Sequence, residues 1–355
     1  MSGAYVVHAL RTAVMPHGGA FAGLRVEDLG APVVRALLEA TGIAPDQVDE
    51  VICSNALGEG GNPARRIALA AGLPDRVAGL TTDRQCAGGL DALLLARALV
   101  VSGMARVVVA GGVESWSRRP ERRMPGAAEP YLQAPFTPWP DRDPDMAEAA
   151  AALSTRLGIS RAAQDAWAVE SHRKALAADL SPEIVPVAGV TRDPFARALT
   201  PAIAARAKVL TGPITAANAA VAADGAAFAL VVAPDIAARF APACRLTGVT
   251  RGGVPWEPGT APIAAIFEVL QDRSPDAAEV MEAYAAQAIA CVEGAGLDPA
   301  IVNAQGGALA RGHPIGASGA VLAVRLFHRM AAGAGLGLAA IAAAGGIGTA
   351  LVLEQ

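Results

Sequence analysis

The stretch CAGGLDALLLARAL, residues 86–99, places a cysteine and two glycines directly before an apolar helix. A similar arrangement returns at PIGASGAVLAVRL, residues 314–326, where His313 takes the position before the helix. The preceding segments also correspond, because Val51 lies 35 residues before Cys86 and Val280 lies 33 residues before His313. Recurrence at near-equal spacing predicts two similar halves, in which Cys86 and His313 face one cleft.

Strand-like and helical segments alternate along the chain. Apolar runs at 4–10, 49–57 and 106–112 suit strands, and helices are expected at 26–41 and after Cys86. This order is typical of an α/β fold whose strands are buried on both faces. From residue 116 to 213 the composition changes: a stretch rich in Pro and Arg precedes two helical passages at 146–158 and 160–178. We interpret this part as an inserted lobe, either a cover for a ligand or a surface excursion without a site.

The composition of the chain limits its function classes. The 355 residues are 53% hydrophobic and 17% charged with a net charge of −4, which favours a large core and argues against nucleic acid as the main partner. The four cysteines form no CxxC pair, so neither a disulfide framework nor a zinc site is expected. These features and the absence of a signal peptide indicate a cytoplasmic protein. The apolar tail at 333–354 is rich in glycine, which predicts two buried core segments and no membrane span.

Cys86 and His313 are the candidate chemical groups. Gly88 and Gly89 suit a tight turn that a ligand can approach, and the N-terminus of the following helix is expected to lower the pKa of the Cys86 thiol. The alternative is a small buried cysteine with no chemical role. His313 stands among five glycines in NAQGGALARGHPIGASGA, residues 303–320, a setting that suits a base or an oxyanion donor better than a core histidine.

Three motifs resemble those of the thiolases, which are acyl-CoA:acyl-CoA acyltransferases: DRQCAGGLDA, AGGVESWS and NAQGGALARGHPIGASG. The blocks RTAVMPHGGAF, NPARRIALAAGLP, ISRAAQDAWAVESHRKA, ITAANAAVAADGAA and EVMEAYAAQ are similar to thiolase segments in the same order, so the likeness runs nearly end to end. It implies an α/β thiolase fold of two similar halves in a five-layered αβαβα arrangement with an inserted loop domain. The N-terminal half would span 1–117 and be completed by about 213–236, the loop domain 118–212, and the C-terminal half 237–355.

The resemblance also implies roles for individual residues. Cys86 would take the acyl group from acyl-CoA as a thioester, and His313 would activate Cys86 and help hold the thioester oxygen of the second substrate. The backbone N–H groups of Cys86 and Ala344 would form an oxyanion hole. Substrate contacts would fall on Met146, Ala216, Ala220, Ala283 and Tyr284. Coenzyme A enters as a thioester substrate, no cofactor or metal is implied, and the chain would form a homodimer or a dimer of dimers.

The sequence departs from the family at positions that carry the second half-reaction. Ala342 replaces the acid/base cysteine of the Cys-x-Gly-Gly-Gly-x-Gly loop, and alanine carries no proton. Met281 and Tyr284 replace the asparagine and phenylalanine of the Asn-Glu-Ala-Phe block, and Ala220 replaces a serine that contacts pantetheine. Losing an oxyanion group and a general base costs roughly a hundredfold or more each. Glu282 is one candidate for a replacement base.

Three hypotheses follow from these residues. The first is an acyltransferase that forms an S-acyl intermediate on Cys86 but catalyses little carbon–carbon condensation or thiolysis. If another group replaces the missing base, the same chain would be a conventional 3-ketoacyl-CoA thiolase. The second is a non-catalytic thiolase-like protein that binds acyl-CoA or a partner subunit. The third is a thioester hydrolase with water as the acceptor. The acyl-enzyme distinguishes them, because it would be stable in an impaired transferase, absent in a binding protein and transient in a hydrolase.

Overall fold

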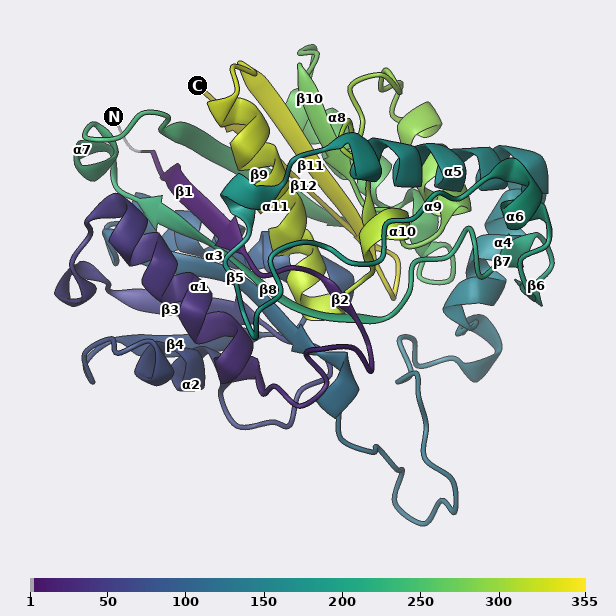
Figure 1. Cartoon of the computed structure of the whole chain (residues 1–355), viewed down its shortest axis with the longest axis horizontal. Coiled ribbons are helices and arrows are strands. Elements are labelled where there is room, and N and C mark those ends of the chain that lie inside the picture. Colours follow the sequence, from purple (N-terminus) through teal and green to yellow (C-terminus); the bar gives the residue numbers. More distant parts are fainter. Residues whose placement is uncertain (1–2) are drawn as a thin grey trace.

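A computed structural model describes residues 3–355, and a large mixed sheet runs through its centre (Figure 1). The elements of the first half of the chain are β1 (Tyr5–Arg11), β2 (Met15–Pro16), α1 (Val26–Thr41), β3 (Glu50–Ser54), α2 (Pro63–Ala70), β4 (Ala78–Thr82), α3 (Gly88–Val101), β5 (Val107–Ser115), β8 (Ala223–Val232) and α7 (Pro234–Ala237). The elements of the second half are β9 (Cys244–Gly252), α8 (Pro262–Leu270), β10 (Ala277–Val280), α9 (Ala285–Gly294), α10 (Ala308–Arg311), α11 (Ile315–Ala331), β11 (Leu336–Ala343) and β12 (Ile347–Glu354).

The two halves repeat one strand topology. The strand order in the sheet is β10-β11-β12-β9-β1-β8-β5-β3-β4. From the centre, the set β1-β8-β5-β3 leads toward one edge and the set β9-β12-β11-β10 leads toward the other. In each set the outer pair is parallel and the next two pairs are antiparallel. The sets join where β1 and β9 pair over two residues, Tyr5 with Arg245 and Val6 with Cys244. This arrangement confirms the two similar halves inferred from the repeated sequence.

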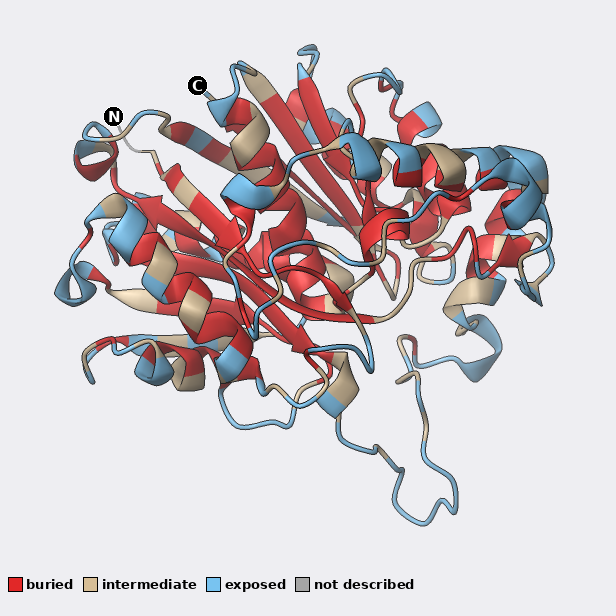
Figure 2. Cartoon of the chain, in the orientation of Figure 1, coloured by how far each residue is buried: buried red, intermediate tan, exposed pale blue. Residues whose placement is uncertain are grey.

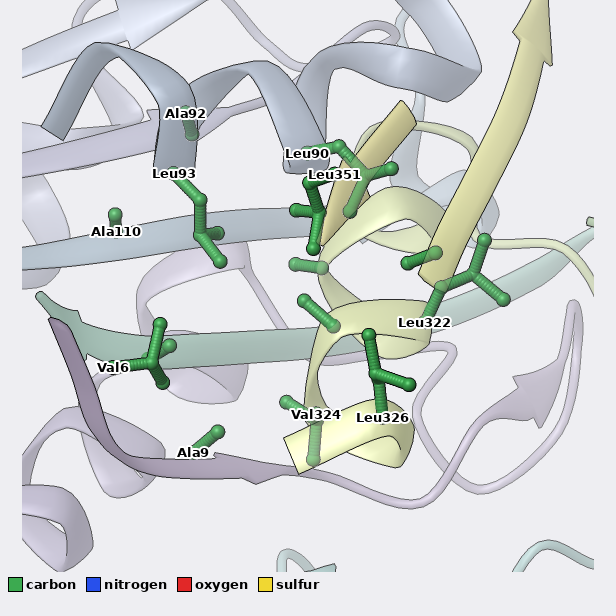
Figure 3. Close-up of a cluster of buried hydrophobic side chains, with 14 of the residues drawn as sticks. Val6, Ala9, Leu90, Ala92, Leu93, Ala110, Leu322, Val324, Leu326 and Leu351 are labelled. Atoms are coloured by element: carbon green, nitrogen blue, oxygen red, sulfur yellow. The ribbon is translucent and has the colours of Figure 1, made fainter. Parts of the chain in front are cut away.

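Five layers of helix and sheet alternate through the molecule. Helices α3 and α11 form the central layer, because each contacts strands of both sets: α3 packs on β3, β5, β9 and β12, and α11 on β1, β8, β10 and β11. Helices α1 and α2 cover the outer face of the first set, and α8 and α9 that of the second. The central core contains Leu90 and Leu93 of α3 together with Leu322 and Leu326 of α11 (Figure 3). The αβαβα layering is therefore the one predicted.

The two central helices cross at glycines. A Cβ on Gly89 of α3 would overlap the backbone nitrogen of Ala320, and a Cβ on Gly319 of α11 would lie 2.5 Å from the backbone nitrogen of Leu90. The backbones therefore pack directly against each other, which no larger residue permits. Gly88 is also helical, and a Cβ there would meet the Ser54 hydroxyl. The interpretation of Gly88 and Gly89 as a tight turn open to a ligand was wrong, since both serve helix packing.

The part of the chain between β5 and β8 leaves the layered body. Residues 119–145 form an irregular loop that projects from the body and is largely exposed (Figure 2). The rest holds α4 (Met146–Leu157), α5 (Arg161–Ala177), α6 (Pro201–Ala205), β6 (Val209–Thr211) and β7 (Ile214–Thr215). Helices α4 and α5 pack against α9. This excursion therefore covers one end of the second half rather than standing apart from it.

The apolar tail forms part of the core. Its residues make the antiparallel pair β11 and β12, in register from Leu336 opposite Glu354 to Ala343 opposite Ile347. The prediction of two buried segments at 333–354 is thus confirmed. In residues 3–355 no helix combines the length and the apolar character that a membrane crossing requires.

The helix crossing can be tested by adding one methyl group. We expect Gly89→Ala to lower the free energy of unfolding by about 2 kcal/mol, because overpacking the crossing outweighs the gain in helix propensity. Gly23→Ala is the matched control, since Gly23 has no neighbour within 4 Å of the added Cβ and needs no left-handed backbone. Urea unfolding of both variants measures the difference. Equal stability of Gly89→Ala and the unmodified chain would contradict the close packing.

Candidate active site

The structure brings Cys86 and His313 together, as the repeat predicted. The Cys86 Sγ lies 3.1 Å from the His313 Nε2. Cys86 occupies the short 3-10 turn Gln85–Ala87 before α3, which Gln85 enters with a left-handed φ of 48°. His313 precedes α11, and its backbone N–H donates to the Val221 carbonyl over 2.7 Å. The crossing of α3 and α11 therefore determines the separation of the thiol and the imidazole.

Ser318 fixes the tautomer of His313. The Ser318 Oγ lies 2.6 Å from the His313 Nδ1 and donates to the Pro314 carbonyl over 3.1 Å. The Pro314 carbonyl can only accept, so we assign the single hydroxyl proton of Ser318 to it and the Ser318 oxygen as the acceptor of the His313 Nδ1–H. The Nε2 lone pair is then directed at the Cys86 thiol, which is the arrangement a general base requires. Ser318 stands in the GASG segment, where no sequence pattern pointed to this role.

Burial favours the neutral forms of both Cys86 and His313. Burial raises the pKa of the Cys86 thiol to about 12, the backbone N–H of Cys86 itself opposes that rise, and the charges of Glu114 and Asp83 add to it. Burial lowers the pKa of His313 to about 4. The expectation of a lowered thiol pKa was wrong, because burial of Cys86 raises it. Proton transfer must therefore accompany the attack of sulfur on a substrate.

Cys86 and His313 open into a cavity of about 340 Å³. Its wall is mainly apolar and comes from both halves and from the inserted segment. Among the residues predicted from the sequence, the cavity contains Cys86, His313, Ala344, Met146, Ala220, Ala283, Tyr284 and Ala342. Other lining residues, to which no sequence pattern gave a role, include Arg119, Arg122, Asp145, Glu257, Gln287 and Leu57. The inserted segment thus forms one wall of the cavity through Arg119, Asp145 and Met146.

Two backbone donors reach this cavity. Cys86 and Ala344 both line it, and neither N–H donates a hydrogen bond to another group among residues 3–355. Ala344 lies in the turn between β11 and β12, next to Gly345 and Gly346, which have left-handed φ angles of 78° and 74°. Free N–H groups of this kind suit an oxyanion that forms on a thioester carbonyl. The oxyanion role of the two N–H groups stays a prediction.

Two residues singled out in the sequence, Ala216 and Met281, do not line this cavity. Ala216 lines a second cavity of about 300 Å³, together with Arg197, Arg206 and Lys208. Met281 is 1% exposed and packs in the core between the sheet and the central helices.

Glu282 has a structural setting. Its carboxylate accepts hydrogen bonds from the Trp167 indole, the Ser171 hydroxyl, the Asn303 amide and the Leu309 N–H, over 2.7–3.2 Å. It does not line the cavity that holds Cys86. The hypothesis that Glu282 replaces the missing base was therefore wrong, because its oxygens are engaged away from the reacting groups.

Glu114 is a buried carboxylate that joins two loops of the site. It accepts from the Asn55 amide and from the N–H groups of Ala56, Leu57 and Gly316, over 2.9–3.2 Å. These contacts tie the loop after β3 to the first turn of α11. Burial raises the pKa of Glu114 to about 7 against the effect of the three N–H donors. No spacing in the sequence pointed to it, since its partners come from two distant loops.

Comparison with known proteins places the chain in a family. The model of the thiolase N-terminal domain matches residues 4–235, and that of the thiolase C-terminal domain matches residues 240–355. The chain therefore belongs to the thiolase family. Among its relatives are the acetyl-CoA acetyltransferases of Thiocystis violacea and Paracoccus denitrificans, each 38% identical to this chain. The alignment with the Thiocystis violacea protein covers 99% of this chain and 98% of the relative. The alignment with the Paracoccus denitrificans protein covers 100% of both chains.

A solved structure supports the same assignment. The crystal structure of the Bacillus anthracis acetyl-CoA acetyltransferase matches with a TM-score of 0.93 and 33% sequence identity. The match covers 100% of this chain and 99% of that one. The layered fold and the two-half topology are therefore those of a thiolase.

Removal of the Ser318 hydroxyl tests the tautomer of His313. We expect Ser318→Ala to slow acylation of Cys86 roughly ten- to hundredfold, because Nδ1 loses its acceptor and the imidazole loses its fixed orientation. Single-turnover release of CoA from acetyl-CoA measures the rate. Ser102→Ala, at the exposed end of α3, is the control. A Ser318→Ala protein that reacts as fast as this control would show that Ser318 does not orient the base.

The two pKa shifts predict an unusual pH dependence. The imidazole stays neutral down to its lowered pKa of about 4, and the thiol stays protonated throughout the neutral range. We therefore expect a level acylation rate from pH 6 to 9, with loss only on the acid side as His313 becomes protonated. Rapid-quench mass measurement of the acylated chain follows this rate. A rise with a midpoint near 8.5, typical of a free thiol, would disprove the neutral pair.

Proposed function

We propose that this chain is an acyl-CoA acyltransferase that forms an S-acyl intermediate on Cys86. The observation that carries the proposal is the 3.1 Å contact between the Cys86 Sγ and the His313 Nε2, at a cavity large enough for an acyl group. The names of the relatives, acetyl-CoA acetyltransferases, favour an acetyl or similarly short acyl donor. Coenzyme A enters as the thioester substrate, and the proposal requires no resident cofactor.

The acylation step uses groups already in place. The Cys86 sulfur attacks the thioester carbon while its proton passes to the His313 Nε2, so no free thiolate has to form first. The carbonyl oxygen gains negative charge, which the N–H groups of Cys86 and Ala344 stabilise. The C–S bond to CoA then breaks, and the His313 proton goes to the departing thiol. The products are S-acyl-Cys86 and free CoA.

The second step lacks a dedicated base for a carbon acid. Ala342 lines the cavity with a methyl group at the family's acid/base position, and Met281 is buried in the core. Two carboxylates also border the cavity, but Asp145 caps helix α4 by accepting from the Ala147 N–H, and Glu257 pairs with Arg156 at 3.0 Å. His313 is therefore the group that would deprotonate the acceptor. We infer that carbon–carbon condensation and thiolysis of 3-ketoacyl-CoA are slow relative to acylation.

The second cavity supports a CoA substrate. Arg197, Arg206 and Lys208 surround it, and phosphate groups of CoA bear the charge that such a cluster attracts. The segment from Ala216 to Ala222 borders both cavities, since Ala216 and Ala217 line the second and Ala220 and Ala222 line the first. A ligand that reaches from the cations to Cys86 would follow this segment.

We further propose a homodimer or a dimer of dimers in the cytoplasm. Strand β4 forms the outer edge of the sheet, and Leu80 on it is 45% exposed. An open edge strand with an exposed apolar side chain favours pairing with a second copy. All four cysteines are free, which suits a reducing compartment.

Intact-mass measurement after mixing with acetyl-CoA tests the proposed acylation. We expect an added acetyl group on the unmodified chain together with free CoA, and no adduct on Cys86→Ala, because the nucleophile is then missing. Cys53→Ala is the matched control, since Cys53 is fully buried in β3 and should leave the adduct unchanged.

The persistence of the adduct separates the functions. A stable adduct that moves to an added acceptor supports the transferase, and one that decays in water alone supports a thioester hydrolase. Absence of both adduct and released CoA would overturn the enzyme proposal and favour a protein that binds acyl-CoA without reaction.

A further inference from the structure

The start of helix α9 presents two polar side chains that the acylation chemistry leaves unused. Tyr284 is the N-cap of α9, and Gln287 follows three positions later, on the same side of the helix. Both side chains line the cavity that holds Cys86 and His313. The neighbouring wall is apolar and includes Ala149, Leu153 and Pro258. Two hydrogen-bonding residues therefore adjoin an apolar part of the cavity wall, with Asp145 near Tyr284.

Gln287 offers a hydrogen-bond donor with no partner. Its side chain belongs to a residue that is 4% exposed, and its Oε1 accepts from the Ala283 N–H over 3.2 Å. Because a backbone N–H can only donate, the amide must turn its oxygen toward Ala283 and its NH₂ group away. That Nε2 has no partner in the part of the chain that the structure describes. A buried unpaired donor is costly, and a ligand oxygen would relieve the cost.

Tyr284 is held at a fixed position relative to the reacting pair. The Ala285 N–H donates to the Asn218 carbonyl and the Ala220 N–H to the Ala283 carbonyl, each over 2.9 Å. The same segment accepts the His313 N–H through Val221. Within residues 3–355 the Tyr284 hydroxyl makes no side-chain hydrogen bond. Burial, with the charge of Asp145, raises the pKa of Tyr284, so the phenol keeps its proton and can donate.

We propose that the Tyr284 hydroxyl and the Gln287 NH₂ form a donor pair that binds an oxygen on the acyl chain, apart from the thioester carbonyl. The preferred donors are then hydroxyacyl and similar oxygen-bearing acyl thioesters. The inference rests on the proposed acylation of Cys86. A plain hydrocarbon chain in this cavity leaves the amide unpaired, whereas an oxygen-bearing chain satisfies it. Sites that hydrogen-bond a substrate oxygen reject analogues without it far more strongly than apolar pockets discriminate size.

Matched thioesters test this selectivity. 3-Hydroxybutyryl-CoA is compared with 3-methylbutyryl-CoA, and 4-hydroxybutyryl-CoA with pentanoyl-CoA, so that a methyl group replaces each hydroxyl at nearly constant volume. The rate of Cys86 acylation is read from CoA release and intact mass. We expect at least one hydroxyacyl thioester to react roughly tenfold or more faster than its methyl counterpart.

Two variants assign the selectivity to the donor pair. Gln287→Met removes the amide at similar side-chain length, and Tyr284→Phe removes only the hydroxyl. If Gln287→Met fails to fold, Tyr284→Phe still tests the proposal. Each should reduce the hydroxyl-to-methyl rate ratio several-fold, toward one. The ratio is the readout because a merely structural defect slows both thioesters alike. Gln47→Met and Tyr5→Phe, which lie outside the cavity, are the controls.

The outcomes separate the inference from the function on which it rests. Acetylation of Cys86 with equal rates for hydroxyl and methyl chains overturns the donor pair alone. A hydroxyl preference that survives in both Gln287→Met and Tyr284→Phe overturns it as well, because another group must then bind the oxygen. Absence of any acyl adduct from acetyl-CoA and from all four test thioesters overturns both proposals. Loss of the preference in the variants, with the controls unchanged, supports the donor pair.

Discussion

The contact between the backbones of α3 and α11 is the constraint on which the site depends. Gly89 and Gly319 allow the helices to cross without intervening side chains, so the turns before the helices meet at one point of the molecule. One turn carries Cys86 and the other His313, equivalent positions in two halves that share one topology. A duplicated fold therefore yields an asymmetric reacting pair when the two copies place different residues at the same position.

Burial of the thiol and the imidazole controls the electrostatics of the site. Helix dipoles favour a thiolate, but they act weakly beside the cost of removing a charge from water. The thiol and imidazole consequently remain neutral, and Ser318 rather than a carboxylate holds the imidazole. The buried Glu114 does not serve as a third catalytic group. Its oxygens face backbone N–H groups, and it holds the loop after β3 against α11.

The sequence was sufficient for those features that are encoded locally or by repetition. Helix 26–41, the tail segments and the pairing of Cys86 with His313 followed from periodicity and the repeat. Gly89 was misread because its role depends on a helix more than 200 residues away, which no local pattern reports. Gln287 was missed for a similar reason: whether a glutamine has a partner depends on the complete surroundings of its two polar atoms. The sequence left Glu282 as a candidate base, but in the structure its carboxylate accepts hydrogen bonds from four donors that are distant in sequence.

Under the proposed function, the site holds the groups for acylation and lacks the family's base for the second step. Acylation needs a nucleophile, one base and two N–H donors, and these occupy neighbouring positions around the cavity. Abstraction of a proton from carbon needs a further base at Ala342, where a methyl group now stands. In this proposal His313 is the base beside Cys86. Acceptors with an acidic or nucleophilic heteroatom then need the least additional general-base catalysis from the protein. The chemistry that remains favourable is transfer between heteroatoms, so selectivity must come from how the cavity holds the acyl chain.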